Sequence, residues 1–412
     1  MPLKPLNQHG PTVVPGFSFS GIHSGIKRNK DSLDLGLIHV TSPNPANIAG
    51  VFTTNSIKAA PVVLNMNKIS KHKGRAIIVN SGNANACTGI QGSEDAVTMC
   101  ETTAKFLDCP SDEVFVCSTG VIGQHLPMEK IKSAIPSLIE QSNEKNFLNT
   151  AKSILTTDTF EKYYSKEIQL NGHKITFLGF AKGAGMIQPD MATMLAFIMC
   201  DALVPQDILQ KALRDACEQT FNCITVDGEM STNDSVLLMA NGMAANPEFK
   251  PGSEFYEKFY QGLFDCCDFL SKQIVRDGEG CNKFVELLIS GIDNPNHLKA
   301  VSYAIANSYL VKTAFHGEDP NWGRILSAAG AQAARMGFEI NKNQTSIYFN
   351  DFGVFIKGQP QGEEAEQKAK KAMKNSEFYL KVMFGPNPTK KVKLYTTDLT
   401  PDYIRINANY RS

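Results

Sequence analysis

Strand-like and helix-like segments alternate along this chain without a strict one-to-one order, and this irregular alternation limits the folds that it can adopt. Runs rich in β-branched and aromatic residues predict strands at residues 74–82, 113–120, 174–183, 193–204, 284–291, 345–358 and 391–400. Apolar residues that recur at helical spacing predict helices at residues 93–107, 205–221, 253–275 and 363–375. The irregular order favours mixed sheets covered by helices over a doubly wound parallel sheet.

The charge balance argues against partners that are bound through a strong positive field. The 412 residues contain 41 Lys and Arg and 41 Asp and Glu, so no net charge is available to hold a nucleic acid or an anionic membrane. No apolar run approaches the roughly 20 residues that span a bilayer. The first residues lack the pattern of a signal or transit peptide. We expect a cytoplasmic protein that acts on small molecules.

The residue types that most often carry chemistry are scattered. The ten cysteines form no C-x-x-C pair and lie mostly in apolar segments, which is typical of buried free thiols in a reducing compartment. The eight histidines occur singly, and the phosphate-cradle, nucleophile-elbow and H-E-x-x-H motifs are missing. We expect no metal and no bound cofactor, and a nucleophile in this chain needs a base other than a neighbouring histidine.

Thr193 lies where the Gly- and Pro-containing loop "KGAGMIQPDMA" runs into an apolar segment. One interpretation is that Thr193 only begins a buried strand. The other is that its hydroxyl attacks the carbonyl of Ala192 and cleaves the chain between Ala192 and Thr193. Cleavage would create an α-amino group with a pKa of about 7.7 to 8.0, which could serve as the base for the hydroxyl of the same residue.

A nucleophile of this kind also needs donors for the oxyanion that develops during the reaction. The segment "CSTGVIG" offers the Thr119 hydroxyl and the Gly120 backbone N–H at the end of a predicted strand. The same residue types are also common in ordinary turns. Residues alone leave both interpretations open.

Several long motifs in the same order resemble the ornithine acetyltransferase family, the glutamate N-acetyltransferases of arginine biosynthesis. The motifs are "NSGNANACTG", "STGVIG", "KGAGMIQPDMATMLAFIMCDA", "TVDGEMSTNDS", "GEGCNK" and "GEDPNWGRI". The resemblance extends from near "GFSFSGIHSGIK" to the terminal "NANYRS" and covers essentially the whole chain. It implies self-cleavage into an α chain of residues 1–192 and a β chain of residues 193–412.

The resemblance also implies an activity and a set of site residues. The cleaved enzyme would move an acetyl group from N2-acetylornithine to glutamate by ping-pong kinetics, with Thr193 as nucleophile and Thr119 and Gly120 as the oxyanion pair. Acetyl-CoA is a possible second donor, and an assembly of two α and two β chains is expected. The substrate contacts that it implies are Thr156, Lys182, Thr193, Glu279, Asn407 and Ser412. A cation and an anion, here Lys182 and Glu279, suit a substrate that carries a carboxylate and a distal amine.

The fold that the resemblance implies is α/β, a four-layer α-β-β-α arrangement with mixed sheets and a smaller C-terminal α/β domain. We place the catalytic region at residues 1–290 and the C-terminal domain at residues 291–412, because "SGIDNPNHLK" combines turn residues with a helix start. "GEDPNWGRI" predicts a helix cap at Asp319 or Asn321. "NSGNANACTG" and "TVDGEMSTNDS" either line the site or only shape it.

Two rival functions remain at this stage. The same threonine chemistry, with water in place of glutamate, would make an N-terminal-threonine aminopeptidase or amidase of related fold. In the other rival the chain stays uncleaved and serves as a binding or structural protein.

Overall fold

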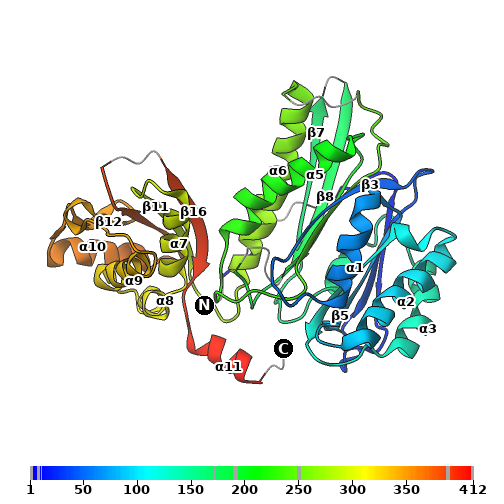
Figure 1. The fold of residues 1–412 in the computed structure, drawn as a ribbon, viewed down its shortest axis with the longest axis horizontal. Helices are drawn as coiled ribbons and strands as arrows, with labels where there is room; N and C mark the ends of the chain where they lie inside the picture. Colours follow the sequence, from blue (N-terminus) through cyan, green and yellow to red (C-terminus); the bar gives the residue numbers. More distant parts are fainter. Residues whose placement is uncertain are drawn as a thin grey trace. The chain divides into compact units, whose positions relative to one another are not determined.

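The chain forms two compact units in the computed structural model (Figure 1). The larger unit comprises residues 6–222 and 229–274, and the smaller unit comprises residues 3–5, 223–228 and 275–409. Within these limits the structure describes residues 3–6, 10, 12–170, 172–188, 194–247, 252–386 and 390–409.

The larger unit contains two mixed sheets. The first has the strand order β1-β2-β5-β6 and the second the order β4-β3-β10-β9-β8-β7. Among the described strands, β5 and β6 pair in parallel in the first sheet and β10 and β9 in the second, and the other neighbouring strands pair antiparallel. The strands are β1 (Phe17–Ile22), β2 (Leu35–Val40), β3 (Ala46–Phe52), β4 (Lys73–Gly74), β5 (Ala76–Asn83), β6 (Val114–Val121), β7 (Lys162–Leu170), β8 (His173–Lys182), β9 (Leu195–Cys200) and β10 (Ser235–Ala240).

These two sheets pack face to face, and helices cover their outer faces (Figure 1). Phe19 of the first sheet meets Phe180 of the second with ring centroids 6.5 Å apart, inside one apolar core. The outer face of the first sheet packs on α2 (Gly89–Leu107) and α3 (Met128–Glu140). This unit also contains α1 (Ala60–Lys68) and α4 (Phe147–Ser153).

The outer face of the second sheet packs on α5 (Gln206–Gln219) and α6 (Glu254–Arg276). Phe177 of β8 packs on Phe259 of α6, with ring centroids 5.5 Å apart. Gln206 and Gln210 of α5 donate hydrogen bonds to backbone carbonyls of β3. Helix, sheet, sheet and helix therefore form the four-layer arrangement that the resemblance implies.

The smaller unit is built on a third mixed sheet of order β14-β13-β12-β15-β11-β16. One apolar core joins this sheet to helices α7 to α10. Its strands are β11 (Phe284–Ser290), β12 (Ser346–Phe349), β13 (Phe352–Ile356), β14 (Gln359–Pro360), β15 (Glu377–Met383) and β16 (Lys391–Thr397). Its helices are α7 (Pro295–Ala306), α8 (Tyr309–His316), α9 (Trp322–Arg335), α10 (Glu363–Met373) and α11 (Pro401–Asn409).

Most elements that the hydrophobic patterns predict are present. The helical patterns at residues 93–107, 205–221, 253–275 and 363–375 correspond to α2, α5, α6 and α10. The run at residues 345–358 forms two strands, β12 and β13, because the chain turns at Asn350, which has a φ of 50°. The division between the units differs from the boundary expected after Ser290, because β11 pairs with β15 and β16 and so belongs to the third sheet.

Candidate active site

Thr119 and Gly120, the expected oxyanion pair, lie at the end of β6 beside a bulge in β5. Thr119 is buried. Gly120 has a φ of 132°, and a Cβ at this position would lie 2.4 Å from the carbonyl carbon of Gly82. Because this conformation and this close approach both exclude a side chain, the backbone path at the end of β6 requires glycine.

Lys182 ends β8 in the second sheet and reaches the end of β6 in the first. Its side chain is buried, and Nζ donates to the Thr119 hydroxyl oxygen at 3.4 Å, a long hydrogen bond. The face-to-face packing of the two sheets thus brings together two residues that the sequence separates by 63 positions.

Asp158 connects the segments that carry Thr156 and Lys182. Its Oδ2 accepts the Thr156 N–H at 3.0 Å, and its Oδ1 accepts the Gly183 N–H at 2.7 Å. The Lys162 ammonium donates to the same Oδ1 at 2.7 Å, and both side chains of this ion pair are fully buried. Burial alone would raise the pKa of Asp158, but the charges of Lys162 and Lys182 and the hydrogen bonds hold it below its usual range.

A third ammonium, that of the partly buried Lys27, belongs to the same region. Lys27 donates to the carbonyl oxygens of Leu33 at 2.9 Å and Leu155 at 2.7 Å. Burial lowers its pKa to about 8, against the opposing charges of Asp34 and Asp158. With Lys182 nearby, the region contains more than one cationic group, which suits recognition of a carboxylate.

The segment before β10 supports the beginning of β9. The fully buried Asp234 accepts the Met194 N–H on Oδ1 at 2.8 Å. Asn233 donates from Nδ2 to the carbonyl oxygens of Ala84 at 2.6 Å and Ser118 at 2.8 Å. "TVDGEMSTNDS" therefore holds together the ends of β5, β6 and β9, and part of it shapes the region around Thr119.

Glu279 and Asn407 meet in the smaller unit. Asn407, on α11, donates from Nδ2 to Oε2 of Glu279 at 2.7 Å. The turn that carries Glu279 is fixed by Gly280, whose carbonyl accepts from the Thr400 hydroxyl at 2.7 Å. Gly280 has a φ of 66°, and a Cβ there would lie 2.6 Å from the Tyr403 nitrogen.

Three of the expected site residues lie outside the described part of the chain: Ala192, Thr193 and Ser412. The others form two groups, with Thr119, Gly120, Thr156 and Lys182 in the larger unit and Glu279 and Asn407 in the smaller one. Sequence reasoning assigned no role to Lys27, Asp158, Lys162 and Asp234. Asp158 and Asp234 stand inside the motifs "LTTDT" and "TNDS", but no local pattern distinguishes a buried carboxylate from a turn residue.

The other motifs have structural roles in the described residues. In "GEDPNWGRI" the Asn321 side chain accepts the Arg324 N–H at 3.1 Å and caps α9, as predicted for one of two candidates. In "NSGNANACTG", Asn80 accepts on Oδ1 a hydrogen bond at 2.6 Å from the hydroxyl of Ser118 in β6, which links β6 to β5.

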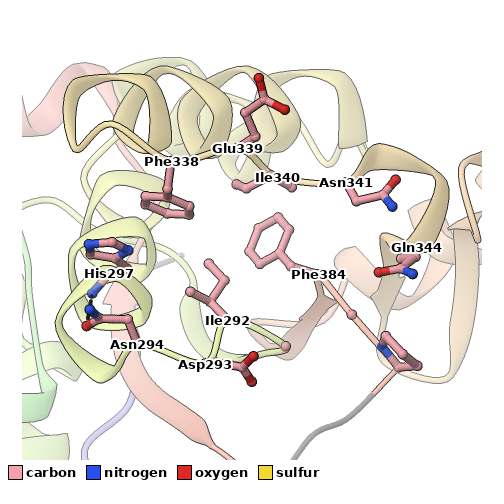
Figure 2. Close-up of a pocket in the computed structure, with 13 residues that line it drawn as sticks. Ile292, Asp293, Asn294, His297, Phe338, Glu339, Ile340, Asn341, Gln344 and Phe384 are labelled. Atoms are coloured by element: carbon pink, nitrogen blue, oxygen red, sulfur yellow. Dashed lines mark hydrogen bonds between the residues drawn. The ribbon is translucent and has the colours of Figure 1, made fainter.

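The smaller unit also contains a cavity of about 490 Å³, and none of the expected site residues that the structure describes lines it. Figure 2 shows the His297 ring stacked on Phe338, with Ile292 and Phe384 across the hollow. The centroids of the stacked rings are 4.3 Å apart.

Within the described ranges of the chain, no group of three His, Cys, Asp or Glu side chains is arranged to hold a metal ion. None of the helices described there has the length and apolar character needed to cross a membrane.

Comparison with known proteins identifies the family. The model of the ArgJ family matches residues 18–412. The chain belongs to the ArgJ family. Among its ArgJ relatives, the arginine biosynthesis bifunctional protein ArgJ of Geobacter sulfurreducens is 44% identical over 399 residues, which cover 97% of this chain and 100% of that protein. The ArgJ protein of Thermotoga neapolitana is 42% identical over 406 residues, again 97% and 100% of the two chains.

A crystal structure of ornithine acetyltransferase complexed with ornithine from Mycobacterium tuberculosis is 34% identical to this ArgJ-family chain. The match covers 43% of this chain and 92% of that one, with a TM-score of 0.38.

Proposed function

We propose that this ArgJ-family chain transfers an acetyl group from N2-acetylornithine to glutamate, giving ornithine and N-acetylglutamate in arginine biosynthesis. The observation that carries the proposal is the 44% identity to a bifunctional arginine biosynthesis protein over 97% of this chain and all of that protein. The buried contact between Lys182 and Thr119, which belong to different sheets, supports it.

In the proposed mechanism the chain first cleaves itself between Ala192 and Thr193. The Thr193 hydroxyl then attacks the acetyl carbonyl of N2-acetylornithine, and the new α-amine takes the hydroxyl proton. Thr119 and Gly120 donate to the oxyanion of the tetrahedral intermediate. The C–N bond breaks, ornithine leaves with the proton, and the acetyl group stays on Thr193 as an ester. The glutamate amine attacks this ester, and the hydroxyl of Thr193 is restored.

The substrate contacts follow from the same family membership. Lys182 is proposed to hold a substrate carboxylate, because an ammonium kept in a buried position favours an anionic partner. We keep Thr156, Glu279, Asn407 and Ser412 as further proposed contacts. Cytoplasmic location and an assembly of two α and two β chains are also proposals.

The decisive assay measures release of ornithine from N2-acetylornithine with and without glutamate. A transferase releases ornithine in proportion to the N-acetylglutamate that it forms. Equal release of ornithine with and without glutamate would refute the proposal and indicate an amidase, since water would then hydrolyse the acetyl-enzyme.

Intact mass spectrometry tests the cleavage independently. A pure preparation should contain fragments of residues 1–192 and 193–412, and Thr193→Ala should abolish both cleavage and transfer. Thr119→Ala should slow transfer by about 10²- to 10³-fold, because only one oxyanion donor is removed. A preparation that contains only the full-length chain but transfers acetyl groups at a normal rate contradicts the mechanism.

The name "bifunctional" of the relatives supports a second donor, and we propose that acetyl-CoA also acetylates glutamate in this chain. The test is formation of N-acetylglutamate from acetyl-CoA and glutamate in the absence of N2-acetylornithine. No product above the background of the Thr193→Ala variant would limit the enzyme to the exchange reaction.

A further inference from the structure

Lys27 binds the peptide group that joins Leu155 to Thr156, one of the expected substrate contacts. Its ammonium donates to the carbonyl oxygen of Leu155 at 2.7 Å. The N–H of the same peptide group, that of Thr156, donates to Oδ2 of Asp158 at 3.0 Å. A cation therefore holds one side of this peptide group and an anion holds the other. Hydrogen bonds with one ionised partner are stronger than neutral ones, so the orientation of the peptide plane is closely defined.

The backbone of Lys27 is itself fixed by a buried carboxylate. Asp34 is fully buried. Its Oδ1 accepts the Ser24 N–H at 2.6 Å, and its Oδ2 accepts the N–H groups of Ile26 at 2.8 Å and Lys27 at 2.9 Å. The loop "HSGIK" therefore wraps around one anion. The charge of Asp34 also opposes the effect of burial on the pKa of Lys27 and so favours its ionised form.

The side chain of Lys27 reaches Leu155 across the end of β5. A Cβ at Gly82 would lie 3.1 Å from Cγ of Lys27, and the same glycine packs on Gly120 of β6. A second hydrogen bond, to the Leu33 carbonyl oxygen at 2.9 Å, ties the ammonium to the segment before β2. Two of the three donors of this ammonium are thus bound to main-chain carbonyls, and Lys27 holds the backbone beside the expected site.

We propose that Lys27 is a positioning residue for Thr156: together with Asp158 it fixes the peptide group between Leu155 and Thr156, so that the Thr156 side chain meets N2-acetylornithine in one orientation. The inference rests on the proposed function, in which Thr156 contacts the substrate. Because χ1 of threonine is stiff, the direction of its hydroxyl follows the backbone closely. Loss of the ammonium lets the peptide plane rotate, which weakens substrate binding and leaves the chemical step largely unchanged.

Lys130 offers a matched control on the loop that carries Lys27. Its ammonium donates to the Gly25 carbonyl oxygen at 3.0 Å, and its side chain is exposed. Lys130→Met therefore removes a hydrogen bond between an ammonium and a carbonyl from the same loop, but one that ends on Gly25 and not on Leu155.

The experiment measures kcat and KM for N2-acetylornithine in the full-length chain, with the cleaved fraction followed by intact mass. Lys27→Met keeps the apolar stem of the side chain and should raise KM about tenfold, with kcat within about twofold, because a charged donor that supports only binding is lost. Lys27→Arg, which retains a cationic donor, should keep KM within about threefold of wild type. Lys130→Met should match wild type, and all variants should cleave as wild type does.

A double-mutant cycle with Thr156→Ala separates positioning of Thr156 from a general loss of structure. Thr156→Ala alone should raise KM, since it removes the contact itself. In that background Lys27→Met should raise KM by less than about twofold more, because no hydroxyl remains to be positioned. Lys27→Gln, which keeps a neutral donor, replaces Lys27→Met in every comparison if circular dichroism shows that the methionine variant is unfolded.

Three outcomes overturn the inference. An unchanged KM in Lys27→Met shows that the peptide group needs no ammonium. An equal rise of KM in Lys130→Met assigns the effect to the loop as a whole. The same rise of KM from Lys27→Met with and without Thr156→Ala shows that Lys27 acts independently of Thr156. A wild-type protein that transfers no acetyl group from N2-acetylornithine refutes the proposed function itself, and the inference with it.

Discussion

The buried ion pair between Asp158 and Lys162 is expected to be a main support of the larger unit. Both side chains are fully buried, and Nζ lies 2.7 Å from Oδ1. Replacing Lys162 by Met keeps the apolar volume but leaves a buried carboxylate without its closest cation. Such a loss generally costs about 3–5 kcal/mol in the free energy of unfolding. Asp158 retains the N–H groups of Thr156 and Gly183 and the charge of Lys182, so we expect the lower end, about 3 kcal/mol.

Equilibrium urea unfolding followed by circular dichroism measures this cost. The control is Lys174→Met on the neighbouring strand β8, where an exposed lysine pairs with Glu167 at 2.9 Å. That variant should hardly change the unfolding midpoint, because exposed ion pairs contribute little. Adding Asp158→Asn to Lys162→Met should recover part of the loss, since the uncompensated charge is then removed. Equal midpoints for Lys162→Met and Lys174→Met would refute this account of the ion pair.

Three further outcomes follow from local geometry. Gly120→Ala should destabilise the larger unit by about 3 kcal/mol or more, because its Cβ would lie 2.4 Å from the Gly82 backbone. The control Gly123→Ala, whose Cβ meets nothing within 4 Å, should cost only about 1–2 kcal/mol. Equal losses of stability in thermal unfolding would contradict the clash. Burial lowers the pKa of His39 to about 4, and the unfolded value near 6.5 is higher. As the pH falls, the unfolded state therefore binds the proton first, and the free energy of unfolding should fall between about pH 6.5 and pH 4 by at most about 3 kcal/mol. Urea unfolding at a series of pH values measures this fall, and His39→Gln should reduce it. An unchanged pH dependence in His39→Gln would show that His39 is not its cause. Asn321→Ala should lower the free energy of unfolding by about 1 kcal/mol through loss of the α9 cap, and an unchanged value in urea unfolding would argue against the cap.

Local sequence patterns predicted the elements well because their causes lie within a few residues. The apolar spacing at residues 205–221 places Leu209, Leu213 and Ala216 on one face, and the same residues are buried in α5. The run at residues 174–183 forms β8, which is buried along most of its length. The irregular order of these elements correctly favoured mixed sheets.

The candidate site was only partly accessible to the same reasoning. The family resemblance drew attention to Thr119 and Lys182, but their contact depends on the packing of two sheets and not on any local spacing. In the sequence, Asp158 and Asp234 cannot be distinguished from aspartates in ordinary turns. Lys162, the ion-pair partner of Asp158, is only four positions away in the sequence. The burial of that pair, and the contact of Asp234 with the Met194 N–H 40 positions away, appear only when the strands are assembled.

The sequence by itself determined the secondary-structure pattern, the family, and the motif that contains Ala192 and Thr193, because each of these depends on residues that are adjacent in the chain. Tertiary structure alone decided which polar groups lose their water and which donors they meet there. Asp234 illustrates the difference: its environment depends on burial and on the Met194 N–H 40 positions away, and both are properties of the packed sheets.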